Sequence, residues 1–140
     1  MGAIRSRCIP ALLGVFCGCL ALPLEGAAQG TAELVAEAVR PLPPDLRDGA
    51  TVFRYDPDTG LRHVLRQGTN YLECAPEDER AFTRCWPVAS ASWRDLRAQL
   101  SAEGVPSDEI GSRMQAAVSA GDVTAPAFGS LSYRLYDDGD

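Results

Sequence analysis

One histidine, three arginines and two cysteines are the side chains of this chain that could carry chemistry. His63 is the single histidine, and a general base needs a nucleophile and an orienting group beside it, which no motif in this sequence supplies. Arg54, Arg62 and Arg66 alternate along two strand-like stretches, so they would share one sheet face and could hold an acidic ligand. We therefore treat His63 and these arginines as binding candidates and predict no catalytic residue.

The first 28 residues have the layout of a secretory signal peptide. Arg5 and Arg7 form a short basic region, an apolar run follows over 8–24, and small residues precede position 29. This order predicts export with cleavage between Ala28 and Gln29. The mature chain is then expected in the periplasm or outside the cell, without membrane attachment.

Two alternatives to cleavage stay open. The segment could be retained as an anchor, although its apolar run has 17 residues with Pro10 and Pro23 near its ends, whereas a spanning helix needs about 20. Lipidation at Cys17 or Cys19 is the other alternative, although Phe16 fits a lipoprotein signal poorly. If neither alternative holds, Cys8, Cys17 and Cys19 are simply apolar residues of a segment that is removed.

The cysteine count becomes simple once this segment is removed. Three of the five cysteines lie in it, and Cys74 and Cys85 remain. An even pair in an exported chain predicts a disulfide, and by the chain-entropy model a loop this short contributes about 3 kcal/mol. A redox site would show Cys-x-x-Cys and a structural zinc site would need four ligands, so we predict neither a metal nor a cofactor.

The mature chain is acidic. Without Arg5, Arg7 and Glu25 it carries 11 arginines against 18 carboxylates, a formal charge of −7 compared with −6 for the whole chain. This sign disfavours nucleic acid and anionic membranes, so we expect a protein or small-molecule partner. The absence of lysine and the abundance of Ala, Gly and Pro indicate a GC-rich bacterial genome.

Proline and glycine positions divide the mature chain into three parts. Residues 29–47 are predicted as a short peripheral helix, capped by Thr31, and a Pro-rich extended segment. Residues 48–136 are predicted as a single globular domain, and 137–140 as an acidic tail.

Within the domain, strand patterns come first and helix patterns later, which indicates an α+β fold. Four stretches have the composition of strands, and we expect a small antiparallel meander from them: a hairpin over 51–66 and strands near 71–74, 82–86 and 130–136. In the hairpin, a three-residue loop would keep the apolar faces together. That register places Tyr55 opposite His63 and Phe53 opposite Leu65.

A helical hairpin is predicted between the last two strands. Its helices cover 93–103 and 107–120, each ends at a glycine, and both are expected to pack on the sheet. Ser92 is the expected N-cap of the first helix, with Asp95 at the capping-box position, and Ser107 is the expected N-cap of the second.

Two further patterns have both a structural and a functional interpretation. The stretch 56–60 resembles the start of a calcium loop, but its fifth and twelfth positions are Gly60 and Gln67, so a turn accounts for it better. Trp86, Trp93 and Tyr136 could line a sugar-binding face, whereas tryptophans beside a disulfide and a helix start are more often part of the core.

Four segments together resemble a family of small exported bacterial proteins of unassigned function. They are Asp48-Gly-Ala-Thr-Val52, Leu65-Arg-Gln-Gly-Thr-Asn70, the cysteine pair and Leu131-Ser-Tyr-Arg-Leu135. The resemblance implies export and one compact domain, and it transfers no active site. The sequence thus predicts a small exported, disulfide-containing domain with a non-catalytic binding or structural role. The alternatives are a hydrolase-like enzyme using His63 and a membrane-tethered accessory subunit.

Overall fold

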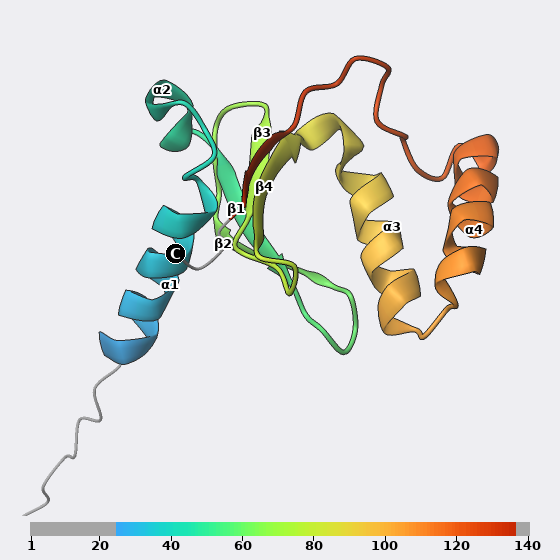
Figure 1. Ribbon diagram of the computed structural model, residues 1–140, viewed down its shortest axis with the longest axis horizontal. Helices are drawn as coiled ribbons and strands as arrows, with labels where there is room; N and C mark the ends of the chain where they lie inside the picture. Colours follow the sequence, from blue (N-terminus) through green and yellow to red (C-terminus); the bar gives the residue numbers. More distant parts are fainter. Residues whose placement is uncertain (1–24, 137–140) are drawn as a thin grey trace, which may run out of the picture.

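A five-stranded sheet separates two groups of helices (Figure 1). The computed structural model describes residues 25–136, so most of the predicted signal segment, with its possible lipidation sites, and the tail after Tyr136 lie outside the described residues. Helix α1 (Glu25–Ala38) and the short α2 (Pro44–Arg47) lie on one side of the sheet, and α3 (Ala91–Ala102) and α4 (Ser107–Ala120) lie on the other. The predicted α+β fold is confirmed.

The strand order differs from the meander expected from the sequence. The strands are β1 (Thr51–Tyr55), β2 (Arg62–Arg66), β3 (Leu72–Ala75), β4 (Phe82–Pro87) and β5 (Tyr133–Tyr136), in the order β2-β1-β3-β4-β5. All neighbours are antiparallel except β1 and β3, which are parallel. The chain therefore crosses from one side of β1 to the other before β3 begins.

Close backbone contact at Gly68 holds this crossing in place. The amides of Thr69 and Asn70 both donate to the carbonyl of Gly49, at 2.7 and 2.8 Å, and the amide of Gly68 donates to Thr51 Oγ1 at 3.1 Å. A Cβ on Gly68 would lie 2.3 Å from the oxygen of Gly49, so only glycine fits. The turn after β2 is thus fixed against the start of β1, which explains why the meander prediction is wrong.

The β1–β2 hairpin is confirmed, but its predicted register is wrong. Tyr55 pairs with Arg62 rather than His63, and Phe53 pairs with Val64 rather than Leu65. The Asp56 amide donates to the Leu61 carbonyl at 2.8 Å, so the loop has four residues, 57–60. Inside this loop the Asp56 carboxylate accepts hydrogen bonds from the backbone and hydroxyl of Thr59, which a three-residue loop would not allow.

The face of the sheet toward α1 carries the main core. Val52, Leu72, Cys74 and Cys85 are fully or almost fully buried there, together with residues from the end of α1 and the following turn, Ala38, Val39 and Leu42. A bulge in the pairing between Val52 and Phe53 returns Leu65 to this cluster. Helix α1 begins at Glu25, before the predicted N-cap Thr31, and its buried end shows that it is not peripheral.

The opposite face is covered by α3, and α4 packs on the outside of α3 (Figure 1). Leu100 of α3 meets Ile110 and Met114 of α4 in a second buried cluster, so one helix of the predicted helical hairpin contacts the sheet rather than both. The left-handed residue after α4 is Gly121, as predicted, with a φ of 82°.

The predicted N-caps of both helices are wrong. Helix α3 follows a short 3-10 helix, Val88–Ser90, and neither Ser90 nor Pro106 caps its helix through a side-chain hydrogen bond. The Ser92 hydroxyl instead accepts the amide of Thr124 at 3.1 Å. Asp95 is turned toward the sheet, where a buried arginine and a tyrosine bind it.

Candidate functional site

The structure separates the three arginines that the sequence placed on one face. Arg54 is exposed on β1, whereas Arg62 lies beneath α3. Arg66 has a structural role, since its guanidinium donates to the carbonyls of Arg47 and Ala50 at the end of α2. The face was misassigned because the hairpin loop has four residues and the bulge in β1–β2 shifts Arg66 relative to Arg62.

His63 is exposed and pairs across the hairpin with Arg54, not with Tyr55. Among the described residues its side chain makes no hydrogen bond, and its electrostatic neighbour is Asp56 in the loop. Hydrogen bonds from Thr59 hold the pKa of the Asp56 carboxyl below its usual range. Within residues 25–136, no hydrogen bond orients the His63 ring or joins it to a nucleophile, as general-base chemistry would require.

A buried ionic network lies between the sheet and α3, and sequence reasoning did not find it. Its centre is Glu73, which is 3 % exposed and accepts from both Arg62 and Arg94. Arg62 also donates to Asp95 through Nε at 2.9 Å, and the Tyr55 hydroxyl donates to the same carboxylate at 2.7 Å. Two guanidinium groups and two carboxylates thus balance within this network.

Aromatic rings shield the network from water. The guanidinium of Arg62 lies 3.8 Å from the ring centre of Phe53, and that of Arg94 lies 5.1 Å from the ring centre of Trp86. Burial lowers the pKa of Arg62, but hydrogen bonds with Asp95 and Glu73 outweigh it and raise that pKa overall. The network links β2 and β3 to α3, and so fixes α3 on the sheet.

The sequence contains one signal that could have revealed this network. Glu73 stands between Leu72 and Cys74 in a short apolar strand, so it must face the side of the sheet opposite to theirs. A carboxylate at such a position requires cationic partners from the next layer. Arg94 and Asp95 lie on the helix that forms that layer.

Tyr55 gives the network a testable pH dependence. Burial, followed by the hydrogen bond to Asp95, raises the pKa of Tyr55 well above its ordinary value of 10. The native state then keeps a proton that the unfolded chain releases, so the free energy of unfolding is expected to fall as pH rises above about 10. Urea unfolding between about pH 8 and pH 11 checks this, and Tyr55→Phe should flatten the fall.

The matched control for this prediction is Tyr71→Phe, at a tyrosine that is 61 % exposed. Its unfolding free energy should follow the wild-type pH dependence. Tyr55→Phe also removes the hydrogen bond to the Asp95 carboxylate, which costs about 1.5–3 kcal/mol at neutral pH. Equal alkaline slopes for wild type and Tyr55→Phe would contradict the assignment.

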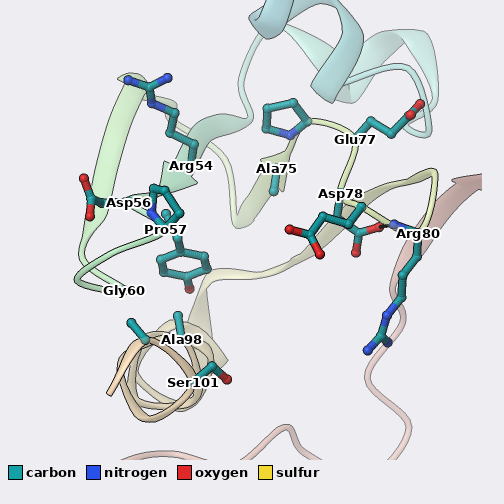
Figure 2. A pocket seen from close by; sticks show the side chains of 14 residues that line it. Arg54, Asp56, Pro57, Gly60, Ala75, Glu77, Asp78, Arg80, Ala98 and Ser101 are labelled. Carbon is teal, nitrogen blue, oxygen red and sulfur yellow. Dashed lines mark hydrogen bonds between the residues drawn. The ribbon is translucent and has the colours of Figure 1, made fainter. Parts of the chain in front are cut away.

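A cavity of about 790 Å³ opens at one end of the sheet, and we name it the loop cavity (Figure 2). Its three walls are the hairpin turn from 54 to 60, the segment 75–80 that follows β3, and the C-terminal half of α3. In Figure 2, Arg54 and Asp56 lie on one wall, Glu77 and Asp78 on the facing wall, and Ala98 along the helix. A cavity of this volume lies within the range of small-molecule sites.

Local hydrogen bonds hold two of these walls in fixed shapes. Gly60 has a φ of 66° and is buried so closely against α3 that a Cβ would lie 2.5 Å from the carbonyl oxygen of Ala98. On the facing wall, the Asp78 carboxylate accepts the amides of Arg80 and Phe82 and binds the Arg84 guanidinium at 2.7 Å. The cavity is therefore preformed rather than created by a ligand.

The lining is charged, and its one serine is Ser101. The residues that line the loop cavity include neither histidine nor cysteine. Asp78 is occupied by Arg84. The other charged lining residues are Glu77, Glu79 and Arg80 on the same wall, and Arg54 and Asp56 on the hairpin wall. The arrangement can bind and orient charged groups of both signs.

The disulfide between Cys74 and Cys85 is confirmed. The two residues lie directly opposite each other on β3 and β4, their Cα atoms are 4.0 Å apart, and both are fully buried. The bridge closes the segment that carries the 75–80 wall of the loop cavity.

Three searches add no homologue to this description. Comparison with protein-family models, with curated proteins and with solved structures found no match. Over residues 25–136, no group of three or more His, Cys, Asp or Glu side chains is placed to hold a metal ion. In that same range no helix has the length and apolarity needed to span a membrane.

Proposed function

We propose that this protein is exported and that its domain is a non-catalytic binding module, with the loop cavity as its binding site. The observation that carries the proposal is the preformed cavity itself, whose lining holds Arg54 on one wall and Glu77 and Glu79 on another. Preformed walls favour binding because little conformational entropy is lost when a ligand enters.

The charges indicate the class of ligand. Arg54 is suited to an anionic group, and Glu77 and Glu79 on the facing wall are suited to a cationic one. A ligand carrying both charges would satisfy both walls at once. We therefore propose a zwitterionic ligand, such as an amino acid or a short peptide.

A nitrogen-15 NMR titration tests this proposal, with dipeptides as probes. Amide shifts are expected on both charged walls and along α3 near Ala98. Arg54→Ser should weaken binding about tenfold, because it removes one charge-assisted contact. The matched control is Arg113→Ser, since Arg113 lies on the exposed surface of α4 and contacts only Glu109 there.

The same titration distinguishes binding from catalysis by His63. His63→Gln should leave dipeptide affinity unchanged, because His63 does not line the loop cavity. If a dipeptide were hydrolysed by the wild type and not by His63→Gln, the hydrolase-like alternative would replace this proposal. Dipeptide-induced amide shifts that are the same in Arg54→Ser as in the wild type would also contradict the proposed binding site.

Export has its own support and its own test. Cleavage after Ala28 would remove only the first four residues of α1, and Val35, Ala38 and Val39, which pack on the sheet, would remain. The intact mass of protein from the native host should correspond to a chain that begins at Gln29 and carries one disulfide. A mass that includes Met1 would instead support the membrane-tethered alternative, and an added acyl mass on Cys17 or Cys19 would support lipidation.

A further inference from the structure

A second cavity, of about 220 Å³, lies at the opposite end of α3, and we name it the tryptophan cavity. Its apolar walls are the rings of Trp86 and Trp93 together with Pro87, Pro126 and Leu131. The volume is below the roughly 300–1,000 Å³ typical of sites for drug-sized molecules, so it suits a single ring. It shares no lining residue with the loop cavity.

A buried polar group at this cavity lacks a partner. Arg94 is 9 % exposed, and its terminal nitrogens donate to Glu73, Ser90 and the Pro87 carbonyl. Its Nε is buried and has no hydrogen-bond partner among the described residues. Leaving such a donor unpaired is costly, and the atom is enclosed by protein, so Arg94 contributes a buried polar wall to the cavity rather than a free donor.

The rim of the cavity adds hydroxyl groups and an exposed apolar side chain. Ser130 and Ser132 are exposed beside the opening and can both donate and accept hydrogen bonds. Leu131 between them is 75 % exposed, so a ligand seated at the opening would remove apolar surface from water.

The charge balance indicates that the ligand is neutral. The cations of Arg94 and Arg62 are already matched by the carboxylates of Glu73 and Asp95. An anionic ligand would bring an extra charge into this balanced, buried network, which costs free energy. A neutral ligand avoids this cost.

We propose that the tryptophan cavity binds one pyranose ring of a neutral glycan. A sugar ring has an apolar C–H face that can stack on an indole ring, and hydroxyl groups at its edge that can bond to the exposed hydroxyls of Ser130 and Ser132. A purely aromatic ligand would leave those polar groups unpaired. This site goes beyond the proposed zwitterion site, because it uses other residues and a ligand of different chemistry.

The test uses the full domain and four neutral trisaccharides: cellotriose, maltotriose, mannotriose and chitotriose. Trp86 and Trp93 are the only tryptophans of the chain, so their two indole N–H signals in NMR report on this cavity. At least one trisaccharide should shift these signals at millimolar concentration. Trp93→Ala should weaken that binding about tenfold or more, as expected for a central aromatic contact.

Trp93 also packs against α4, so a second variant protects the test from misfolding. Ser132→Leu changes an exposed residue and fills the rim, and it should abolish the indole shifts without altering the rest of the spectrum. The matched control is Ser101→Leu at the loop cavity, which should bind the trisaccharide as the wild type does.

Three results would overturn the proposal. One is the absence of indole shifts with all four trisaccharides. Another is binding that Ser132→Leu leaves intact. The third is a neutral aromatic probe, p-cresol, that binds more tightly than every sugar. None of these results bears on the loop cavity, whose dipeptide titration is read from other residues.

Discussion

Replacing Glu73 by glutamine is expected to lower the free energy of unfolding by about 3–5 kcal/mol. Glu73 is 3 % exposed and provides the carboxylate that binds both Arg62 and Arg94. Glutamine keeps the shape but removes the charge, so the buried Arg94 loses its counter-ion and the partly buried Arg62 keeps only Asp95. Small domains have a total stability of about 5–15 kcal/mol, so the change is a large fraction of it. Urea unfolding followed by tryptophan fluorescence measures the loss.

The matched control is Glu77→Gln, the same chemical change at an exposed carboxylate. Its effect should stay within about 0.5 kcal/mol, as is usual for surface substitutions. A loss below about 1 kcal/mol in Glu73→Gln would contradict the role given to the network.

A triple variant separates two quantities. One is the net contribution of the network to the free energy of unfolding, and the other is the loss caused by removing a single partner. Replacing Arg62, Glu73 and Arg94 together by Met removes both cations and the carboxylate that they share, at similar volume. Asp95, which is 30 % exposed, keeps the hydrogen bond from the Tyr55 hydroxyl. Such replacements are often neutral or stabilising, so most of the loss in Glu73→Gln should be recovered. A large loss in Glu73→Gln that the triple variant recovers would mean that the network adds little net stability. Its main role would then be to determine the position of α3 on the sheet.

The elements of the fold were predictable because local signals determine them. Gly104 and Gly121 lie in left-handed conformations just after α3 and α4, where the sequence predicted the helices to end. Alternating apolar residues located each strand to within a few positions. These signals depend on backbone sterics and on burial of one face, which act over a few residues.

The strand register was not predictable because it depends on contacts between distant residues. The sequence argument kept polar side chains off the apolar face beside Tyr55, which required a three-residue loop. The structure places Arg62 on that face, where Phe53, Glu73 and Asp95 compensate for its burial. Those partners come from two other strands and a helix.

Asp95 shows how a local signal can be outweighed. Its spacing from Ser92 is that of a capping box, a contribution of about 1 kcal/mol. In the fold it binds the Tyr55 hydroxyl and the Arg62 guanidinium, and hydrogen bonds involving charged groups contribute about 1.5–3 kcal/mol. The tertiary contacts are stronger, so the candidate cavities, which depend on how α3 is seated, could not be derived from the sequence.

The second prediction concerns the disulfide between Cys74 and Cys85, which lies in the core on the α1 side of the sheet. Replacing Cys74 and Cys85 together by alanine is expected to reduce stability by about 3 kcal/mol, because the unfolded chain regains the entropy of the open loop. Urea unfolding of this variant and of the reduced wild type separates the cross-link from side-chain volume. The reduced wild type keeps both sulfur atoms in the core, so it should lose nearly as much stability if loop entropy dominates.

The bridge should also affect the loop cavity. Its wall at 75–80 lies within the closed segment, but the Asp78 carboxylate and Arg84 hold that wall by bonds that do not involve sulfur. At low temperature, where the reduced protein remains folded, dipeptide shifts at Ala98 should therefore persist with at most a few-fold loss of affinity. Complete loss of the shifts in a folded, reduced protein would mean that the disulfide, rather than the Asp78 contacts, organises the cavity.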